Sequence, residues 1–228
     1  MKKISKSNEL CWVLGNLLCA VSIALCTKSG FGLSMIASPP FIFNQFLAQL
    51  QPFFTQGACE YIFQAILLLI MCLIIRKFRW KHLLSFATAF IFGNLVDASL
   101  WIFGGQQIFD SMLTRIFAFA LGEIITALAI ACYFRTSLPL CIYELFVKAV
   151  SEKFRQPTDK IKLMFDIGML LLSVAFSLLL FGKFVGIGIG TVIITLVNAP
   201  LIKLWGKLLD KIFDNQPLFP RLCKILND

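Results

Sequence analysis

Six long apolar stretches divide the chain, and the connections between them carry most of its charge. They cover residues 10–26, 59–75, 83–103, 112–134, 163–181 and 185–205. A helix needs about 20 residues to cross a bilayer core of roughly 30 Å. The pattern therefore predicts an all-α membrane protein with six transmembrane helices in one integral membrane domain, residues 1–228.

Two of the connections contain shorter amphipathic patterns. Residues 41–51 follow Pro40 and residues 140–155 follow Pro139, and both segments place apolar side chains on one face and polar side chains on the other. Helices of this length are too short to span a bilayer. We therefore expect two short re-entrant or interfacial helices.

The two halves of the chain repeat the same order of elements. Residues 9–104 and 111–205 each read span, short proline-initiated helix, span, span. Because each half has three spans, the second half enters the membrane from the opposite side. We therefore expect a 3+3 inverted repeat, with the short helices on opposite sides and residues 206–228 as a cytoplasmic interfacial tail. At a constant offset, Pro40, Gln45 and Gln49 match Pro139, Glu144 and Lys148.

The basic residues fall on every second connection and predict the orientation. Of the 21 Lys and Arg, only Lys28, Arg115 and Lys183 lie on the other connections. Cytoplasmic loops retain Lys and Arg during insertion, so both termini are expected in the cytoplasm. The excess of positive charge, +9, is then expected to interact with anionic lipid headgroups. Nucleic acid is not an expected partner, because its footprint would be one basic face.

Composition narrows the classes of chemistry. The chain is 59% hydrophobic and 14% charged, whereas soluble domains are about 45–50% apolar. The single His82 and eight cysteines without CxxC spacing do not form a metal-ligand pattern. With no nucleophile motif or paired acidic cluster, we expect no catalytic residues, no metal and no cofactor, and an enzyme is the least favoured class.

Polar residues inside the apolar stretches are the candidate site, because ionisable groups at membrane depth are costly. We favour an interior role, functional or paired, for Asp97 and Glu123, with Arg115 as an alternative structural partner. Glu60, Arg115 and Asp166 lie near span ends, and for them the alternative is snorkelling to the interface. For Glu144 the alternative is an ordinary i,i+4 pair with Lys148. The candidates are Glu60, Gln64, Asn94, Asp97, Arg115, Glu123, Glu144, Asp166 and Asn198.

Glycines recur before the last span. Gly182, Gly186 and Gly190 are spaced by four residues, which favours a tight helix crossing. The alternative is an unwound helix start that exposes backbone donors. A phosphate loop would need a preceding strand, and apolar residues flank this segment on both sides.

Residues 186–202, Gly-Ile-Gly-Ile-Gly-Thr through Asn198-Ala-Pro-Leu-Ile, resemble the last span of the YczE/YyaS/YitT-like bacterial membrane proteins. Residues 23–33 and 139–154 extend the resemblance over nearly the whole chain. The chain departs from the pattern at Ala37-Ser38-Pro39-Pro40, where members often carry an aromatic–acid pair. The resemblance implies this topology and a multi-pass protein of the bacterial inner membrane, and it implies no substrate.

These observations favour a small secondary transporter or permease of a small solute. An anion is one candidate, because short-helix N-termini at Pro40 and Pro139 would offer free backbone N–H groups. Asp97, Glu123 and Asp166 would take protons or cations. The alternatives are a substrate-binding membrane subunit of an energy-coupled importer, and an accessory membrane protein that binds a partner through its basic surface. The sequence leaves a homo-oligomer open.

A cysteine placed at Gln106 tests the orientation. In a variant without the eight native cysteines, a membrane-impermeant thiol reagent should label it from the outer side of intact cells. The reason is that Gln106 lies between the third and fourth spans, opposite the basic connections. Labelling that appears only once the cytoplasm is opened would contradict the predicted topology.

Overall fold

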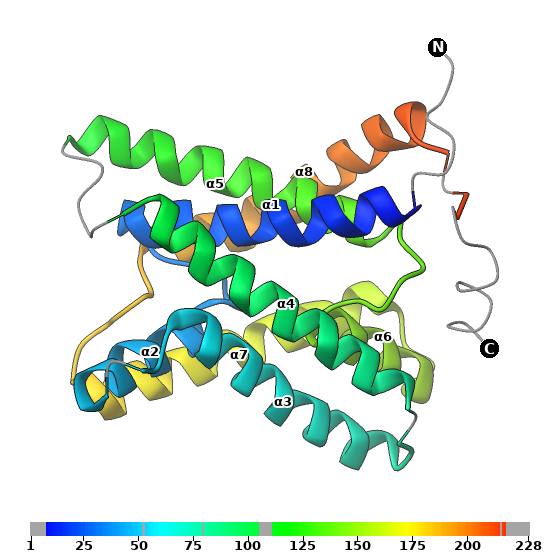
Figure 1. The fold of residues 1–228 in the computed structure, drawn as a ribbon, viewed down its shortest axis with the longest axis horizontal. Coiled ribbons are helices and arrows are strands. Elements are labelled where there is room, and N and C mark those ends of the chain that lie inside the picture. Colours follow the sequence, from blue (N-terminus) through cyan, green and yellow to red (C-terminus); the bar gives the residue numbers. More distant parts are fainter. Residues whose placement is uncertain (1–7, 52, 79, 105–110, 215, 218–228) are drawn as a thin grey trace.

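The computed structural model describes residues 8–51, 53–78, 80–104, 111–214 and 216–217, so Gln106 lies outside the described residues. Within this part of the chain are eight helices (Figure 1). Six of them, all but α2 and α6, are long and apolar enough to cross a membrane, which confirms the six predicted spans. The helices are α1 (Asn8–Ser29), α2 (Ser38–Leu50), α3 (Gln56–Ile75), α4 (Lys81–Ile102), α5 (Met112–Tyr133), α6 (Ile142–Phe154), α7 (Thr158–Phe181) and α8 (Ile189–Ile212).

The two short helices, α2 and α6, each contain 13 residues. Pro39 and Pro40 lie in the first turn of α2, where the fixed φ of proline suits a helix start and its missing N–H is no loss. α2 lies at the end of the bundle where α1 ends, and α6 lies at the opposite end (Figure 1). Both short helices therefore form as expected, at opposite ends of the bundle.

α1 and α5 form the centre of the fold. α1 packs against α4 and α5, and α5 packs against α8. Small residues permit the close approach of the central pair. A Cβ added at Gly15 would lie 2.9 Å from the Tyr133 ring, and one added at Gly122 would lie 2.7 Å from the Cys26 sulfur. Such close packing drives helix association in membranes, because lipid tails are as apolar as the helix surfaces.

The helices α2, α3, α6 and α7 form a second layer (Figure 1). α3 packs against α2, α4 and α6, and α7 packs against α2 and α6. Over their described residues, α7 and α8 make no comparable contact with each other. Only 17% of the apolar segment of each is buried, against 39–56% for the other spans. The bundle is therefore least closely packed between α7 and α8.

The start of α8 differs from the prediction. The last span was expected from residue 185, but α8 begins at Ile189. Gly182 and Gly186 have φ values of 65° and 72°, which a continuous right-handed helix does not permit. Gly182 ends α7 as its left-handed cap, so Gly182, Gly186 and Gly190 do not form one packing face.

Attachments at both ends hold α8 in place. Near its start, the Gly190 N–H donates to the Phe31 carbonyl at 3.1 Å. Near its end, Arg135, which follows α5 directly, donates to the Gly206 carbonyl at 2.5 Å and forms an ion pair with Asp210 at 2.6 Å. Pro200 lies inside the helix, between the two attachments. α8 is thus fixed at its ends and interrupted in its hydrogen bonding near the middle.

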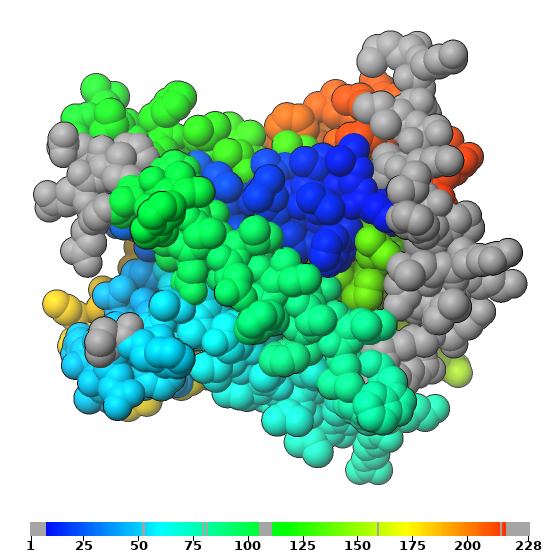
Figure 2. All heavy atoms as spheres, viewed as in Figure 1, coloured from blue at the N-terminus to red at the C-terminus, as the bar shows by residue number. Residues whose placement is uncertain are grey.

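α3 and α4 cross at two glycines that the sequence analysis did not single out. A Cβ added at Gly57 would lie 2.0 Å from the Gly93 carbonyl oxygen, and one added at Gly93 would lie 2.6 Å from the Gly57 oxygen. In the space-filling view, side chains of α1, α3 and α4 cover this face (Figure 2). α3 and α4 are therefore in close contact, whereas α7 and α8 are not.

Replacing Gly57 with alanine should destabilise the fold. The added methyl group overlaps the Gly93 carbonyl, and overpacking of this kind costs about 1–3 kcal/mol. Gly168→Ala is the matched control, because nothing lies within 4 Å of a Cβ at that position in α7. Thermal unfolding in detergent should show a lower melting temperature for Gly57→Ala and an unchanged or higher one for Gly168→Ala. Equal melting temperatures would remove this crossing as a structural determinant.

Candidate functional site

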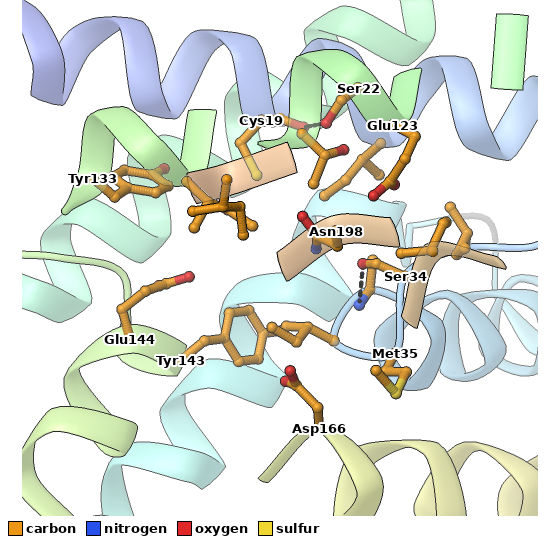
Figure 3. Close-up of a pocket in the computed structure, with 18 of the residues that line it drawn as sticks. Cys19, Ser22, Ser34, Met35, Glu123, Tyr133, Tyr143, Glu144, Asp166 and Asn198 are labelled. Atoms are coloured by element: carbon orange, nitrogen blue, oxygen red, sulfur yellow. Dashed lines mark hydrogen bonds between the residues drawn. The ribbon is translucent and has the colours of Figure 1, made fainter. Parts of the chain in front are cut away.

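A cavity of about 290 Å³ lies between the two layers of helices. Seven helices contribute to its wall, together with the connection before α2. Its size is close to the lower limit of sites that hold small molecules. In Figure 3, Glu123, Glu144 and Asp166 extend toward the same space from different sides, and Asn198 lies between them.

Glu60 enters the cavity from α3 and is fully buried. Its Oε2 accepts a hydrogen bond from the Tyr143 hydroxyl at 2.9 Å, which links α3 to α6. Its Oε1 has no hydrogen-bond partner. One oxygen of this carboxyl group therefore remains available to a ligand or a proton.

Glu123 enters from α5, and its exposed fraction is 5%. Neither of its carboxyl oxygens has a hydrogen-bond partner. The nearby hydroxyl groups of Ser22 and Thr126 do not compensate, because they donate to the carbonyls of Cys19 and Gly122 in their own helices. An unpartnered polar atom at this depth costs about 1–3 kcal/mol, so Glu123 is the strongest indication of a site.

A third group of charges lines the cavity near the start of α7. Lys162 and Asp166 form an ion pair at 2.7 Å, and Glu144 of α6 has one buried oxygen without a partner. Burial raises the pKa of the Glu144 carboxyl, while Lys162 opposes the rise. Lys148 is exposed and no ion pair joins it to Glu144 in the described chain, so the expected i,i+4 pair is absent.

Asn198 of α8 adds a polar group that is not ionisable. Its Oδ1 is buried in the cavity without a partner. Five of the nine candidates therefore meet at one cavity, and four of them present buried oxygens without partners. The five are Glu60, Glu123, Glu144, Asp166 and Asn198.

Asp97 and Gln64 lie outside the cavity and act on helix starts. Asp97 accepts hydrogen bonds from the Thr55 hydroxyl at 2.6 Å and from the Gly57 N–H at 2.7 Å, which caps α3. The side-chain oxygen of Gln64 accepts from the N–H of Ile142 at 3.0 Å, which holds the start of α6. The expected interior role of Asp97 is therefore a paired, structural one in this structure.

Arg115 and Asn94 also lie away from the cavity. Arg115 donates to the Ser29 carbonyl at 2.7 Å and lies over the Phe31 ring, so it holds the end of α1 and does not pair with Glu123. Asn94 is exposed and donates to the Phe90 carbonyl of its own helix. Neither residue meets the other candidates.

The cavity also contains residues that the sequence analysis missed. Tyr133 and Tyr143 place aromatic rings on its wall (Figure 3). Tyr143 belongs to the apolar face of a short helix, so its pattern indicated packing alone. Lys162 appeared only as one of the many cytoplasmic cations, although its four-residue spacing from Asp166 is the ordinary signal for a helix ion pair.

The start of α2 and the first N–H of α6 do not offer the free donors expected for an anion. Pro39 and Pro40 have no N–H, and the N–H groups of Ala37 and Ser38 both donate to Ser34. At the start of α6, the first N–H is taken by the side chain of Gln64. The cavity instead presents carboxyl oxygens, which an anion would not favour.

Asp97 and Glu123 should respond in opposite ways to removal of their charge. Asp97→Asn should lower stability by about 1–2 kcal/mol, because hydrogen bonds to charged groups are strong and α3 loses its capping charge. Glu123→Gln should leave stability unchanged or raise it, because no contact is lost. Thermal unfolding checks both, with Asn94→Ala as an unaffected control. The reverse order would reject this division into structural and site residues.

Comparison with known proteins gives a family without a function. No curated protein and no solved structure matches the chain significantly. Residues 6–207 match the model of a family of unknown function, DUF6198. The match covers all six spans up to the last turns of α8, and with them every residue of the cavity wall. The chain therefore belongs to this family of unknown function, DUF6198.

Proposed function

We propose that the protein is a small secondary transporter or permease that carries a small solute through the central cavity. The observation that carries this proposal is Glu123, whose two buried carboxyl oxygens face the cavity without a partner. A purely structural carboxyl group at this depth would be paired, because an unpaired one is costly. A group that binds and releases a cation or proton has to be left free between binding events.

The helix pairing supports the inverted repeat that we include in this proposal. α1 packs against α4 as α5 packs against α8, and α2 packs against α7 as α6 packs against α3. A two-fold axis that relates residues 9–104 to residues 111–205 would map the α1–α4 contact onto the α5–α8 contact and the α2–α7 contact onto the α6–α3 contact. In inverted-repeat transporters, the substrate site lies at the interface of the repeats, which is the position of this cavity.

One pair of helices breaks the symmetry and suggests how the cavity would open. α3 and α4 are in close contact through Gly57 and Gly93, whereas α7 and α8 are apart and both line the cavity. Two repeats in different conformations expose a central site to one side at a time. With both termini in the cytoplasm, as the charge pattern predicts, the α7–α8 opening faces the cytoplasmic half of the membrane.

The proposal also includes a location, the bacterial inner membrane. The resemblance to YczE/YyaS/YitT-like proteins favours the bacterial inner membrane. Exposed apolar side chains cover α7 and α8, for example Leu171 at 64% and Leu196 at 72%, and lipid tails are the expected partner of such surfaces.

A cysteine at Thr195 tests alternating access without knowledge of the substrate. Thr195 lines the cavity on α8. In a variant without native cysteines, a membrane-impermeant thiol reagent should label Thr195→Cys from the cytoplasmic side in inverted vesicles, and more slowly from the outer side in right-side-out vesicles. Asn94→Cys, on the exposed face of α4 away from the cavity, should resist the reagent from both sides of the membrane. Labelling of Thr195→Cys from one side only would contradict a transporter and favour a binding subunit or an accessory protein.

A further inference from the structure

We propose that the cavity binds an organic dication of the diamine or polyamine class, and that this cation displaces protons from the cavity carboxyl groups. The inference rests on the proposed function and names its substrate class. It starts from the number of acidic groups in the cavity wall: Glu60, Glu123, Glu144 and Asp166.

The charges of the cavity do not balance when all four carboxyl groups are ionised. Two lysines line it, Lys162 inside and Lys203 at the exposed rim. Against four carboxyl groups, two countercharges are missing. Buried unpaired charges are unfavourable, so two positive charges have to be supplied, either by protons or by a bound dication.

The free oxygens point to a ligand with separated donors. Glu60, Glu123 and Glu144 reach the cavity from α3, α5 and α6, and each keeps at least one buried oxygen without a partner. Among the described residues, no three His, Cys, Asp or Glu side chains come close enough to hold one metal ion. A bare metal ion would therefore meet few of these oxygens, whereas ammonium groups at the two ends of a chain can reach carboxyl groups that lie apart.

The rest of the wall suits the carbon chain of such a ligand. Aromatic rings of Phe92, Tyr133 and Tyr143 line the cavity, and their faces attract cations. Lys162 shows that an alkylammonium group fits beside these carboxyl groups, because its Nζ lies 2.7 Å from Asp166. A volume of about 290 Å³ accommodates a short diamine.

Ligand and protons share the same oxygens, so binding should depend on pH. Ammonium groups require ionised carboxylates, and affinity should therefore increase as the pH rises. Other titratable or charged groups lie near the three glutamates. Those near Glu60 are Cys19, Cys59, Asp97, Cys141 and Tyr143. The one near Glu123 is Cys26, and those near Glu144 are Cys19, Tyr133, Cys141, Tyr143, Lys162 and Asp166.

Calorimetry on the purified full-length protein in detergent tests the proposal, with 1,4-diaminobutane as the probe and butylamine as its monovalent control. We expect diaminobutane to bind at least tenfold more tightly than butylamine, more tightly at pH 8 than at pH 6, and with release of protons to the buffer. Glu123→Gln and Glu60→Gln should each reduce the affinity at least tenfold while both proteins remain folded by thermal unfolding. Asn94→Ala should bind as the wild type does.

Equal affinity for the two amines, no binding of diaminobutane by the wild type, or full affinity in a folded Glu123→Gln protein would overturn the proposal. The outcome is separable from that of the transport proposal. Diaminobutane binding together with one-sided labelling of Thr195→Cys would indicate a protein that binds diamines without transporting them. Two-sided labelling of Thr195→Cys without diaminobutane binding would indicate a transporter of another substrate class.

Discussion

The close contact between α1 and α5 is the interaction on which the remaining structure depends. Lipid offers no hydrophobic gain for helix pairing, so the two helices associate because Gly15 and Gly122 allow their surfaces to interlock. α4 then packs against α1, and α8 packs against α5. The central pair also contributes Cys19, Ser22, Glu123 and Tyr133 to the cavity, so a single interface both assembles the bundle and forms one wall of the site.

Hydropathy and proline positions were sufficient to predict the elements, because both are local properties. The short helices and the other span boundaries agree with the structure to within three residues. The exceptions are α7, which begins five residues before its predicted start, and α8, which begins four residues and ends seven residues after its predicted bounds. The α3–α4 crossing was not predictable in the same way. Gly57 and Gly93 lie on different helices, and no periodicity within either helix indicates that they meet.

The candidate site was only half predictable, for a physical reason. The cost of burying polar groups identifies which residues need an explanation, but it does not say whether the partner is a ligand or the protein backbone. Asp97 and Glu123 have equal claims in the sequence, yet Asp97 receives two hydrogen bonds at the start of α3 and Glu123 receives none. The difference comes from the neighbouring helix, since only Asp97 lies beside a helix start with free donors.

The two attachments of α8 restrict the motions that are open to this helix. Gly190 ties its first turn to the Phe31 carbonyl, and Arg135 ties its last turns to α5, so the helix cannot slide along its axis without breaking one of them. Pro200 lies between these points and next to Asn198. A proline inside a helix removes one backbone hydrogen bond and favours a bend at that point. Bending of α8 at Pro200 would therefore change the width of the cavity at Asn198 while both ends of the helix stay attached.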